Sequence, residues 1–152
     1  MKLAEALQER ADLKREIEQL RTRLNNNMLV QEGEQTAEDP TALHKELDRA
    51  IDRLTWLTAQ INHTNCSVRS EGKTLTELIA EKDALAYRIQ IQKMLVQTAS
   101  QKVQRLRNSE IRIRSSINVS EWQAEIDRMA KALRLLDNRL QQTNWSVDLI
   151  ES

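Results

Sequence analysis

The sequence predicts an all-α protein: an antiparallel four-helix bundle, or coiled-coil hairpins, with short β-strand additions at the helix ends. Three observations support this fold class. Charged residues make up 30% of the 152-residue chain, it contains only two Gly and one Pro, and four long segments repeat apolar residues at steps of three and four. Low Gly and Pro content is typical of long helices, and this spacing lines one helix face. We expect one helical domain over residues 1–152.

The first helix is expected over residues 3–26. Its apolar positions alternate steps of three and four, the spacing of a coiled-coil seam. The seam residues are Leu3, Ala6, Leu13, Ile17, Leu20 and Leu24, with Arg10 in the same register. In the connector that follows, a short strand over about 28–34 would place Glu32 and Glu34 on one face, because alternate residues of a strand share a face.

The second helix is expected over residues 40–63. Asp39 is a good N-cap residue, and the ring of Pro40 already holds the φ angle of a first helical turn. The same apolar rhythm then continues, so this helix is expected to pack along a similar seam. Its members are Leu43, Leu47, Ala50, Leu54, Leu57 and Ile61.

The third helix is expected over residues 75–107. Thr74 and Glu77 have the spacing of a capping box, in which each side chain bonds a free backbone N–H group. This helix carries a second apolar line beside its first. A helix with two apolar faces needs two neighbours, so the second line is expected to meet another helix or a partner chain. The second line consists of Ala84, Tyr87, Ile91, Met94 and Leu95.

The fourth helix is expected over residues 121–143. Before it, "SEIRIRSSINV" alternates apolar and charged residues, which predicts a strand over about 110–118. Ser120 and Gln123 have the spacing of a second capping box. The expected seam consists of Trp122, Ile126, Met129, Leu133, Leu136 and Leu140.

One phrase occurs twice, as "HTNCSV" at residues 63–68 and as "QTNWSV" at residues 142–147. Asn tolerates the left-handed conformation that ends helices, and Thr or Ser can bond freed backbone groups. We interpret the phrase as a helix stop signal. The alternative is a ring of Asn and Thr side chains that lines a polar site.

Charges in the segments that leave the helices suggest two strand pairs. Opposite charges across a strand pair attract. At one pole, Glu32 and Glu34 would face Arg112 and Arg114, within one chain or between chains. At the other pole, the basic residue Arg69 would face acids of the C-terminal segment, which are Asp148 and Glu151.

The balance of charge bears on partners. Lys and Arg together number 23, as do Asp and Glu, so the whole molecule has no electrostatic attraction to nucleic acid or to an anionic membrane. A local basic segment is the candidate for phosphate contacts, although it contains no aromatic residue that could stack on a base. We favour pairing of this basic segment with the acidic connector, the segment after the first helix that contains Glu32 and Glu34. The candidate phosphate contacts are Lys102, Arg105, Arg107, Arg112 and Arg114.

No stretch approaches the ~20 apolar residues of a membrane span, and the N-terminus lacks the apolar core of an export signal. We therefore expect a cytoplasmic protein that does not enter membranes. No phosphate-binding Gly loop, nucleophile elbow or paired-Cys metal motif is present. The sequence thus predicts no catalysis, no cofactor and no metal, and a surface pair is the simplest interpretation of His44 and Asp48. Trp145, outside the expected fourth helix, is the candidate anchor of a subunit contact in a homo-oligomer.

Four stretches resemble a small family of bacterial septicolysin-like proteins, and the similarity extends over nearly the whole chain. They are "MKLAEALQERADLKREIEQL", "VQEGEQTAEDP", "EGKTLTELIAEKDAL" and "LDNRLQQTNWSVDL". The name of that family implies a membrane-active protein. From the residues themselves we rank a self-assembling structural module first, a nucleic-acid or phosphate-ligand binder second, and a membrane-active protein third.

Overall fold

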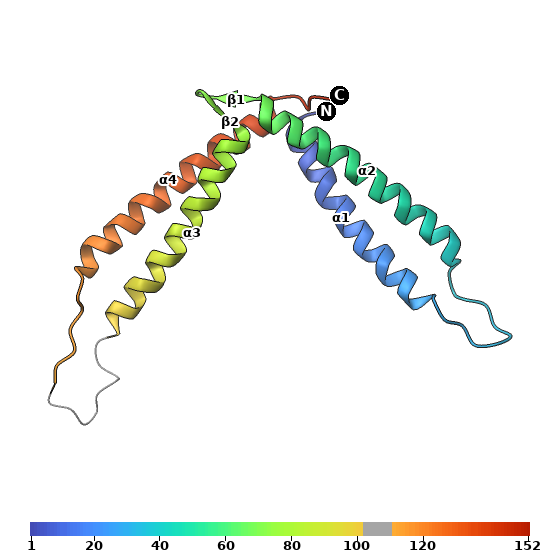
Figure 1. Ribbon diagram of the computed structural model, residues 1–152, viewed down its shortest axis with the longest axis horizontal. Helices are drawn as coiled ribbons and strands as arrows, with labels where there is room; N and C mark the ends of the chain where they lie inside the picture. Colours follow the sequence, from blue (N-terminus) through green and yellow to red (C-terminus); the bar gives the residue numbers. More distant parts are fainter. Residues whose placement is uncertain (102–110) are drawn as a thin grey trace. The chain divides into compact units, whose positions relative to one another are not determined.

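The structure, a computed structural model, describes residues 1–101 and 111–152 and confirms the all-α class (Figure 1). Four helices and one small sheet form the described part of the chain. They are α1 (Leu3–Asn26), α2 (Pro40–Ser67), β1 (Arg69–Ser70), β2 (Lys73–Thr74), α3 (Leu75–Ser100) and α4 (Val119–Ser146). We expected one domain, whereas in the structure the chain divides into two compact units. Met1–Ser70 with Gln142–Ser152 forms the first, and Glu71–Gln141 the second.

The first unit is built on the antiparallel pair α1 and α2 (Figure 1). The predicted seams of both helices are confirmed, because every seam residue is buried or half-buried. Each apolar side chain that leaves water fully contributes about 1.5–3 kcal/mol, so these two rows are the main stabilising feature of the pair. The most deeply buried members are Leu3, Ala6, Leu20, Leu57 and Ile61.

The second unit is built on α3 and most of α4. Ile89 and Val96 of α3 form a buried cluster with Ile126 and Met129 of α4. Trp122 is half-buried against this cluster, as its place on the predicted seam required. An ion pair between Lys82 and Asp137 (Nζ to Oδ1, 2.6 Å) joins the two helices beside the core. The last part of the third predicted helix, residues 102–107, lies outside the described residues.

Helix starts follow local chemistry. Asp39 caps α2 by accepting the Thr41 N–H at 3.0 Å, and Thr74 and Glu77 form the predicted capping box of α3. The prediction of a capping box at Ser120 is wrong. Helix α4 begins two residues earlier than expected, because the Asn118 side chain accepts the Glu121 N–H at 3.1 Å. An Asn side chain is a strong N-cap, and here it precedes the predicted one.

The sheet lies between α2 and α3 in the sequence, and its first strand contains Arg69, which was expected to pair with the C-terminal segment. Strands β1 and β2 pair across a two-residue turn in which Glu71 (φ 52°) and Gly72 (φ 85°) both have positive φ. Two positive φ angles define the turn type that suits the twist of a β-hairpin. Glu71 is a non-Gly residue in this conformation, and its carboxylate pairs with Arg139 at 3.1 Å.

The strand predicted over 28–34 is wrong. The chain turns there instead, because the Glu34 N–H donates to the Gln31 carbonyl at 2.9 Å and Gly33 has a φ of 85°. A tight turn of this kind does not keep Glu32 and Glu34 on one strand face. The period-two pattern of charges was too short to outweigh a Gly that adopts positive φ readily.

The prediction of a strand over 110–118 is also wrong for the residues of this range that the structure describes. Residue 110 lies outside the described residues, and residues 111–118 contain no strand. No second extended segment pairs with these residues within the described chain, and a strand needs a partner for its backbone groups. Near its end the segment bends, since the Ser115 hydroxyl contacts both the N–H and the carbonyl of Ile117.

Candidate interaction surfaces

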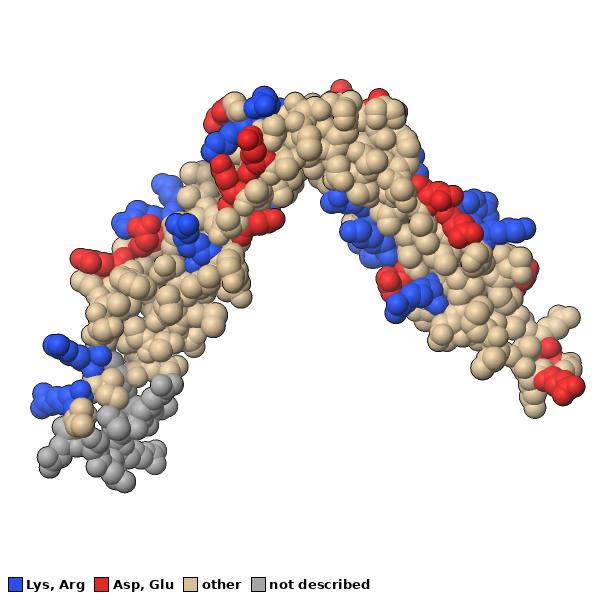
Figure 2. All heavy atoms as spheres, viewed as in Figure 1, with Lys and Arg blue, Asp and Glu red and all other residues tan. Residues whose placement is uncertain are grey.

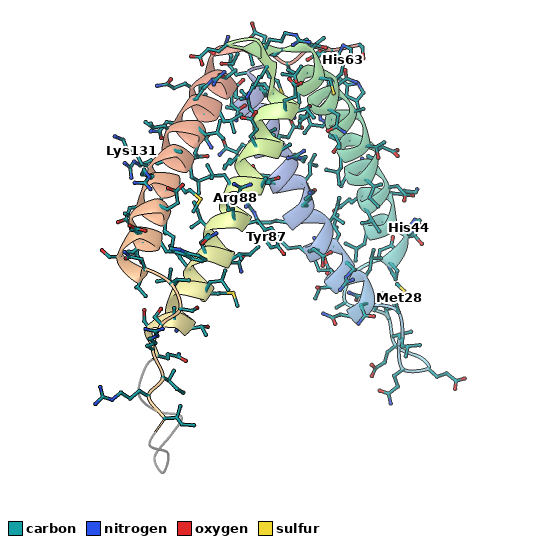
Figure 3. The ribbon with its side chains drawn as sticks, turned by 60° about the vertical axis from the view of Figure 1, so that its left-hand side comes forward. Met28, His44, His63, Tyr87, Arg88 and Lys131 are labelled. Carbon is teal, nitrogen blue, oxygen red and sulfur yellow. The ribbon has the colours of Figure 1, made fainter. Side chains whose placement is uncertain are left out.

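Helix α3 carries an exposed apolar line. Ile91 is 40% exposed, and Tyr87 and Met94 are more than 60% exposed. At 100° per residue these three side chains lie opposite Ile89 and Val96, which pack on α4. Figure 3 shows Tyr87 projecting from α3 on the side away from α4. The second apolar line expected from the sequence is therefore present and exposed.

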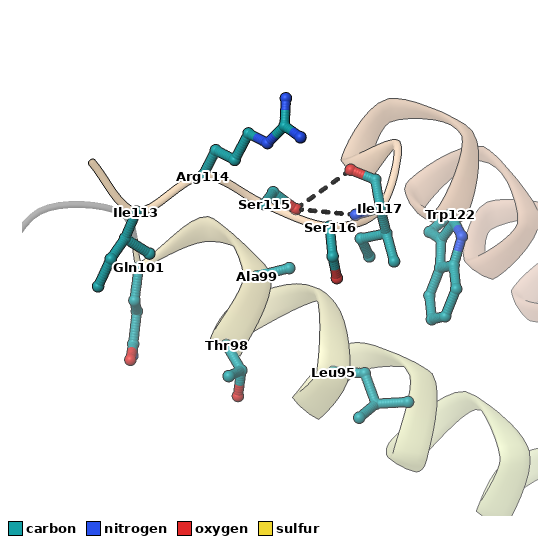
Figure 4. A pocket seen from close by; sticks show the side chains of 10 residues that line it. All are labelled: Leu95, Thr98, Ala99, Gln101, Ile113, Arg114, Ser115, Ser116, Ile117 and Trp122. Atoms are coloured by element: carbon teal, nitrogen blue, oxygen red, sulfur yellow. Dashed lines mark hydrogen bonds between the residues drawn. The ribbon is translucent and has the colours of Figure 1, made fainter. Parts of the chain in front are cut away.

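A cavity of about 300 Å³ lies where the end of α3 meets the segment that leads into α4. Its apolar wall includes Leu95, Ile113 and Trp122, and Thr98 and Ser116 add hydroxyl groups. Figure 4 shows Ile113 and Ser116 on the α3 side of this segment, whereas Arg114 points to the opposite side. The lining residues are Leu95, Thr98, Ala99, Gln101, Ile113, Arg114, Ser115, Ser116, Ile117 and Trp122.

The acidic connector of the first unit divides into two parts. Glu38 pairs with Arg23 (Nε to Oε1, 3.1 Å), and a hydrogen bond from that guanidinium lowers the pKa of the Glu38 carboxyl. Asp39 is occupied as the cap of α2. Glu32 and Glu34 are different, because both are exposed and neither forms an ion pair with any residue in the described ranges.

The buried residue Asn27 fixes this connector. Its side-chain amide donates to the Arg23 carbonyl at 2.7 Å, and its oxygen accepts the Glu38 N–H at 3.0 Å. Nothing in the periodicity of the sequence singled out this residue. The connector is thus held at its base, while its turn projects into solvent.

The basic segment is described only in part. Lys102, Arg105 and Arg107 lie outside the described residues. Arg112 and Arg114 are exposed, and neither forms an ion pair with a described residue. Figure 2 shows blue side chains in this region of the second unit and red side chains at the turn of the first unit. Each surface thus presents charge of one sign.

The C-terminal segment docks within the first unit, where Asp148 has a different partner from the one predicted. The carboxylate of Asp148 pairs with Lys2 (Nζ to Oδ1, 2.9 Å), where the sequence analysis expected Arg69. Two backbone bonds flank this pair: Leu3 N–H to Val147 O at 3.0 Å, and Leu149 N–H to Met1 O at 2.9 Å. These bonds form an antiparallel bridge between Lys2 and Asp148, whereas Arg69 belongs to the β1–β2 hairpin.

Two buried polar residues of α2 receive the same segment. Thr64 is fully buried, and its hydroxyl oxygen accepts the Ile150 N–H at 2.9 Å. Gln60 is 5% exposed, and its side-chain oxygen accepts the Ser152 N–H at 2.8 Å. Buried polar groups require such partners, so these bonds give the two residues a structural role. The spacing of apolar residues along α2 did not predict this structural role.

The repeated phrase ends helices in the same way at both sites, although not as predicted. The Val68 N–H donates to Thr64 O at 2.9 Å, and the Val147 N–H donates to Thr143 O at 3.0 Å. Both helices run through their Asn residue to the following Ser, and among the described non-Gly residues only Glu71 has positive φ. The proposed left-handed Asn is therefore wrong. The alternative, a ring of Asn and Thr side chains, stays a prediction; Thr64 itself accepts a bond from the C-terminal segment.

The aromatic residues differ in environment. Trp145 lies in the last turn of α4, which runs to Ser146, and not outside the helix as expected; its side chain is 57% exposed. Trp56 is half-buried, and the Arg53 guanidinium lies 4.7 Å from its ring centre. Arg53 also pairs with Glu9 of α1 (Nε to Oε1, 2.6 Å), which lowers the pKa of that carboxyl. Trp56 is thus engaged inside the first unit.

Groups with catalytic or ligating potential are scattered. His44 lies 3.4 Å from Asp48 on the surface of α2 (Nδ1 to Oδ2), and Cys66 is exposed. In the ranges 1–101 and 111–152 no cluster of three or more His, Cys, Asp or Glu residues could hold a metal ion. None of the described helices is long and apolar enough to cross a membrane.

Comparisons with known proteins identify the family of the chain. The model of a family of unknown function, DUF6847, matches residues 10–149. The chain is also similar to a functionally unknown conserved protein from Corynebacterium diphtheriae whose crystal structure is known. The two share 33% sequence identity over 99% of each chain, with a TM-score of 0.91. No curated protein matches the chain.

Proposed function

The chain belongs to DUF6847, a family of unknown function, and we propose that it acts as a self-assembling structural module without catalysis. The observation that carries this proposal is the exposed line of Tyr87, Ile91 and Met94 on α3. Exposed apolar side chains in a row on one helix are typical of a surface that another protein covers. We propose that the partner is a second copy of the chain.

Two features favour a second copy over a charged partner. The line contains no charged side chain, so the same patch on two copies can meet without repulsion, as a two-fold interface requires. The chain as a whole also has a formal net charge of zero, so two copies do not repel each other at long range. A strongly charged partner would find no complementary charge along Tyr87, Ile91 and Met94.

Sedimentation velocity over a range of concentrations tests the proposal. The wild-type protein is expected to sediment as an oligomer, and Ile91→Glu is expected to weaken association by at least about tenfold, because a buried charge costs more than the apolar contact it replaces. Leu135→Glu is the matched control. Leu135 is 57% exposed on α4 and lies outside the α3 line. A wild-type protein that stays monomeric at all concentrations would refute the proposal.

Native mass spectrometry of protein purified gently from its own host tests whether the chain carries a bound ligand. The expected spectrum contains only multiples of the 17.7 kDa chain. A stoichiometric metal, metabolite or nucleic acid would instead identify chemistry that the described residues do not suggest.

The alternative function is binding of nucleic acid or of a phosphate ligand through residues 102–114. It is favoured by Arg112 and Arg114, which are exposed and unpaired within the described chain. Phosphate contacts of this kind make affinity fall steeply with salt. Fluorescence anisotropy with labelled single- and double-stranded oligonucleotides tests this alternative. The measurements are made at about 50 and about 200 mM salt, because phosphate contacts weaken over this range.

The membrane-active function implied by the septicolysin-like resemblance stays a prediction. Dye-filled liposomes of neutral and anionic lipid provide the test. Leakage that rises with protein concentration would favour this function over self-assembly as the main role.

A further inference from the structure

We propose that the copies also meet head to tail, with Leu29 of one copy inserted into the cavity beside Trp122 of the next. This inference rests on the proposed self-assembly and specifies a second contact for it. It joins two different surfaces: the turn of the first unit, defined as residues 28–34, and the cavity of the second unit described above. We call them the key turn and the receptor cavity.

The key turn presents apolar side chains where a solvated connector would carry polar ones. Met28, Leu29 and Val30 are consecutive and exposed, and Leu29 is 91% exposed, the highest value among the large apolar residues of the described chain. Three exposed apolar residues in succession are unfavourable unless they have a function. Residues on either side are fixed, by Asn27 at the base and by the Gln31–Glu34 turn beyond. The three side chains are therefore presented on a held loop.

The receptor cavity is suited to one or two such side chains. Its volume of about 300 Å³ is walled by Leu95, Ile113 and Trp122. An aromatic ring beside aliphatic side chains forms the kind of pocket in which a single inserted residue supplies much of the binding free energy. Ile113 is 49% exposed, so an inserted side chain would also remove apolar surface of the cavity wall from water.

Charge selects the partner of each surface. Glu32 and Glu34 follow Leu29 within five residues, while Arg112 and Arg114 flank Ile113 on either side. All four charged residues are exposed and lack an ion pair with a described residue. Insertion of Leu29 would bring two carboxylates towards two guanidinium groups, which favours this orientation over key-to-key or cavity-to-cavity contact. The ion pairs guide the encounter, and the apolar contact supplies most of the affinity.

Because the key and the receptor are different patches, the contact is heterologous. Repetition of such a contact gives a closed ring or an open chain. The α3 line, in contrast, can pair with itself. The two contacts can therefore be broken separately.

Charge reversal followed by mixing tests the inference. One variant carries Glu32→Lys and Glu34→Lys, so both of its surfaces are basic; the other carries Arg112→Glu and Arg114→Glu, so both are acidic. Alone, each is expected to associate about tenfold more weakly than wild type at low salt. An equimolar mixture should regain association, because each copy then meets a surface of opposite charge. The regained association should decrease as salt screens the charges.

Disulfide cross-linking tests whether Leu29 of one copy lies close to Ile113 of the next. In a Cys66→Ser background, a Leu29→Cys protein is mixed with an Ile113→Cys protein and oxidised mildly. A covalent heterodimer is expected, since a disulfide requires the two Cα atoms to approach within about 7 Å. The matched control mixes Leu29→Cys with Leu135→Cys. Equal cross-linking in both mixtures would refute the contact.

The outcomes separate this inference from the proposed function. If the wild-type protein is monomeric throughout, both fail. If it associates while the two charge variants sediment like wild type, the head-to-tail contact fails and self-assembly through the α3 line stands. If both charge variants weaken and their mixture does not recover, the charges do not pair between copies and the inference is overturned.

Discussion

The fully buried hydroxyl of Thr64 accepts the backbone N–H of Ile150 at 2.9 Å, although the two residues are 86 positions apart in sequence. The same hydroxyl donates to the Gln60 carbonyl at 2.8 Å, so both its donor and its acceptor function are used. This one group therefore ties the end of the chain to α2.

Thr64→Val should remove this link while keeping the shape of the side chain. The Ile150 N–H would lose its acceptor, which costs about 1–3 kcal/mol for a buried group. Urea unfolding followed by circular dichroism measures the loss. Thr55→Val is the control, because the Thr55 hydroxyl is exposed and bonds only the Ile51 carbonyl of its own helix. Equal stability of the two variants would contradict the assigned role.

The Lys2–Asp148 pair should make stability depend on pH. A hydrogen bond from Lys2, and then its charge, lower the pKa of the Asp148 carboxyl in the folded state below its ordinary value. The stabilisation that this ion pair gives the folded state is therefore present above the pKa of the unfolded state. It is lost as the pH falls through the lower pKa of the folded state. Asp148→Asn should melt below wild type at neutral pH, and the difference should shrink in acid.

Thermal melts between neutral pH and about pH 2, below the ordinary Asp pKa, measure this difference. Asp52→Asn is the control, because Asp52 is exposed and forms no ion pair with a described residue. A difference in melting temperature between Asp148→Asn and wild type that stays constant across the pH range would argue against stabilisation by the Lys2–Asp148 pair.

Ile126→Ala should destabilise the second unit. Ile126 is 1% exposed and lies in the cluster with Ile89 and Val96. Loss of a buried Ile side chain leaves a cavity and typically costs about 2–5 kcal/mol. Leu135→Ala, at a 57% exposed position of the same helix, should change stability by less than about 0.5 kcal/mol. Similar unfolding midpoints for the two variants would show that the cluster does not stabilise α4.

Trp145→Ala should separate assembly from folding. If Trp145 anchors a subunit contact, the variant sediments as a smaller species than wild type with little change in melting temperature, because the side chain is mostly exposed. Deletion of residues 144–152 is a poorer test, since it also removes the partners of Thr64 and Gln60. An unchanged sedimentation coefficient of Trp145→Ala would exclude this anchor.

The candidate surfaces were only partly predictable from the sequence. The second apolar line of α3 followed from helical period, and its exposure agrees with an unfilled contact face. Leu29 was missed, although three consecutive apolar residues in a connector were a visible signal. The receptor cavity could not be foreseen, because it forms where Ile113 and Trp122 meet the end of α3, and no local pattern encodes that approach.

The sequence by itself determined the features that depend on neighbours along the chain. Helical period and caps at Asp39 and Thr74 specify where helices begin and which faces are buried, because these are interactions over three or four residues. Only the tertiary structure decided how polar groups far apart in sequence pair. Asp148 meets Lys2, and Thr64 receives Ile150, because packing of the helices brings those groups together in space. The strands predicted from charge alternation failed for the same reason: backbone hydrogen bonds require a neighbour, and only the fold supplies one.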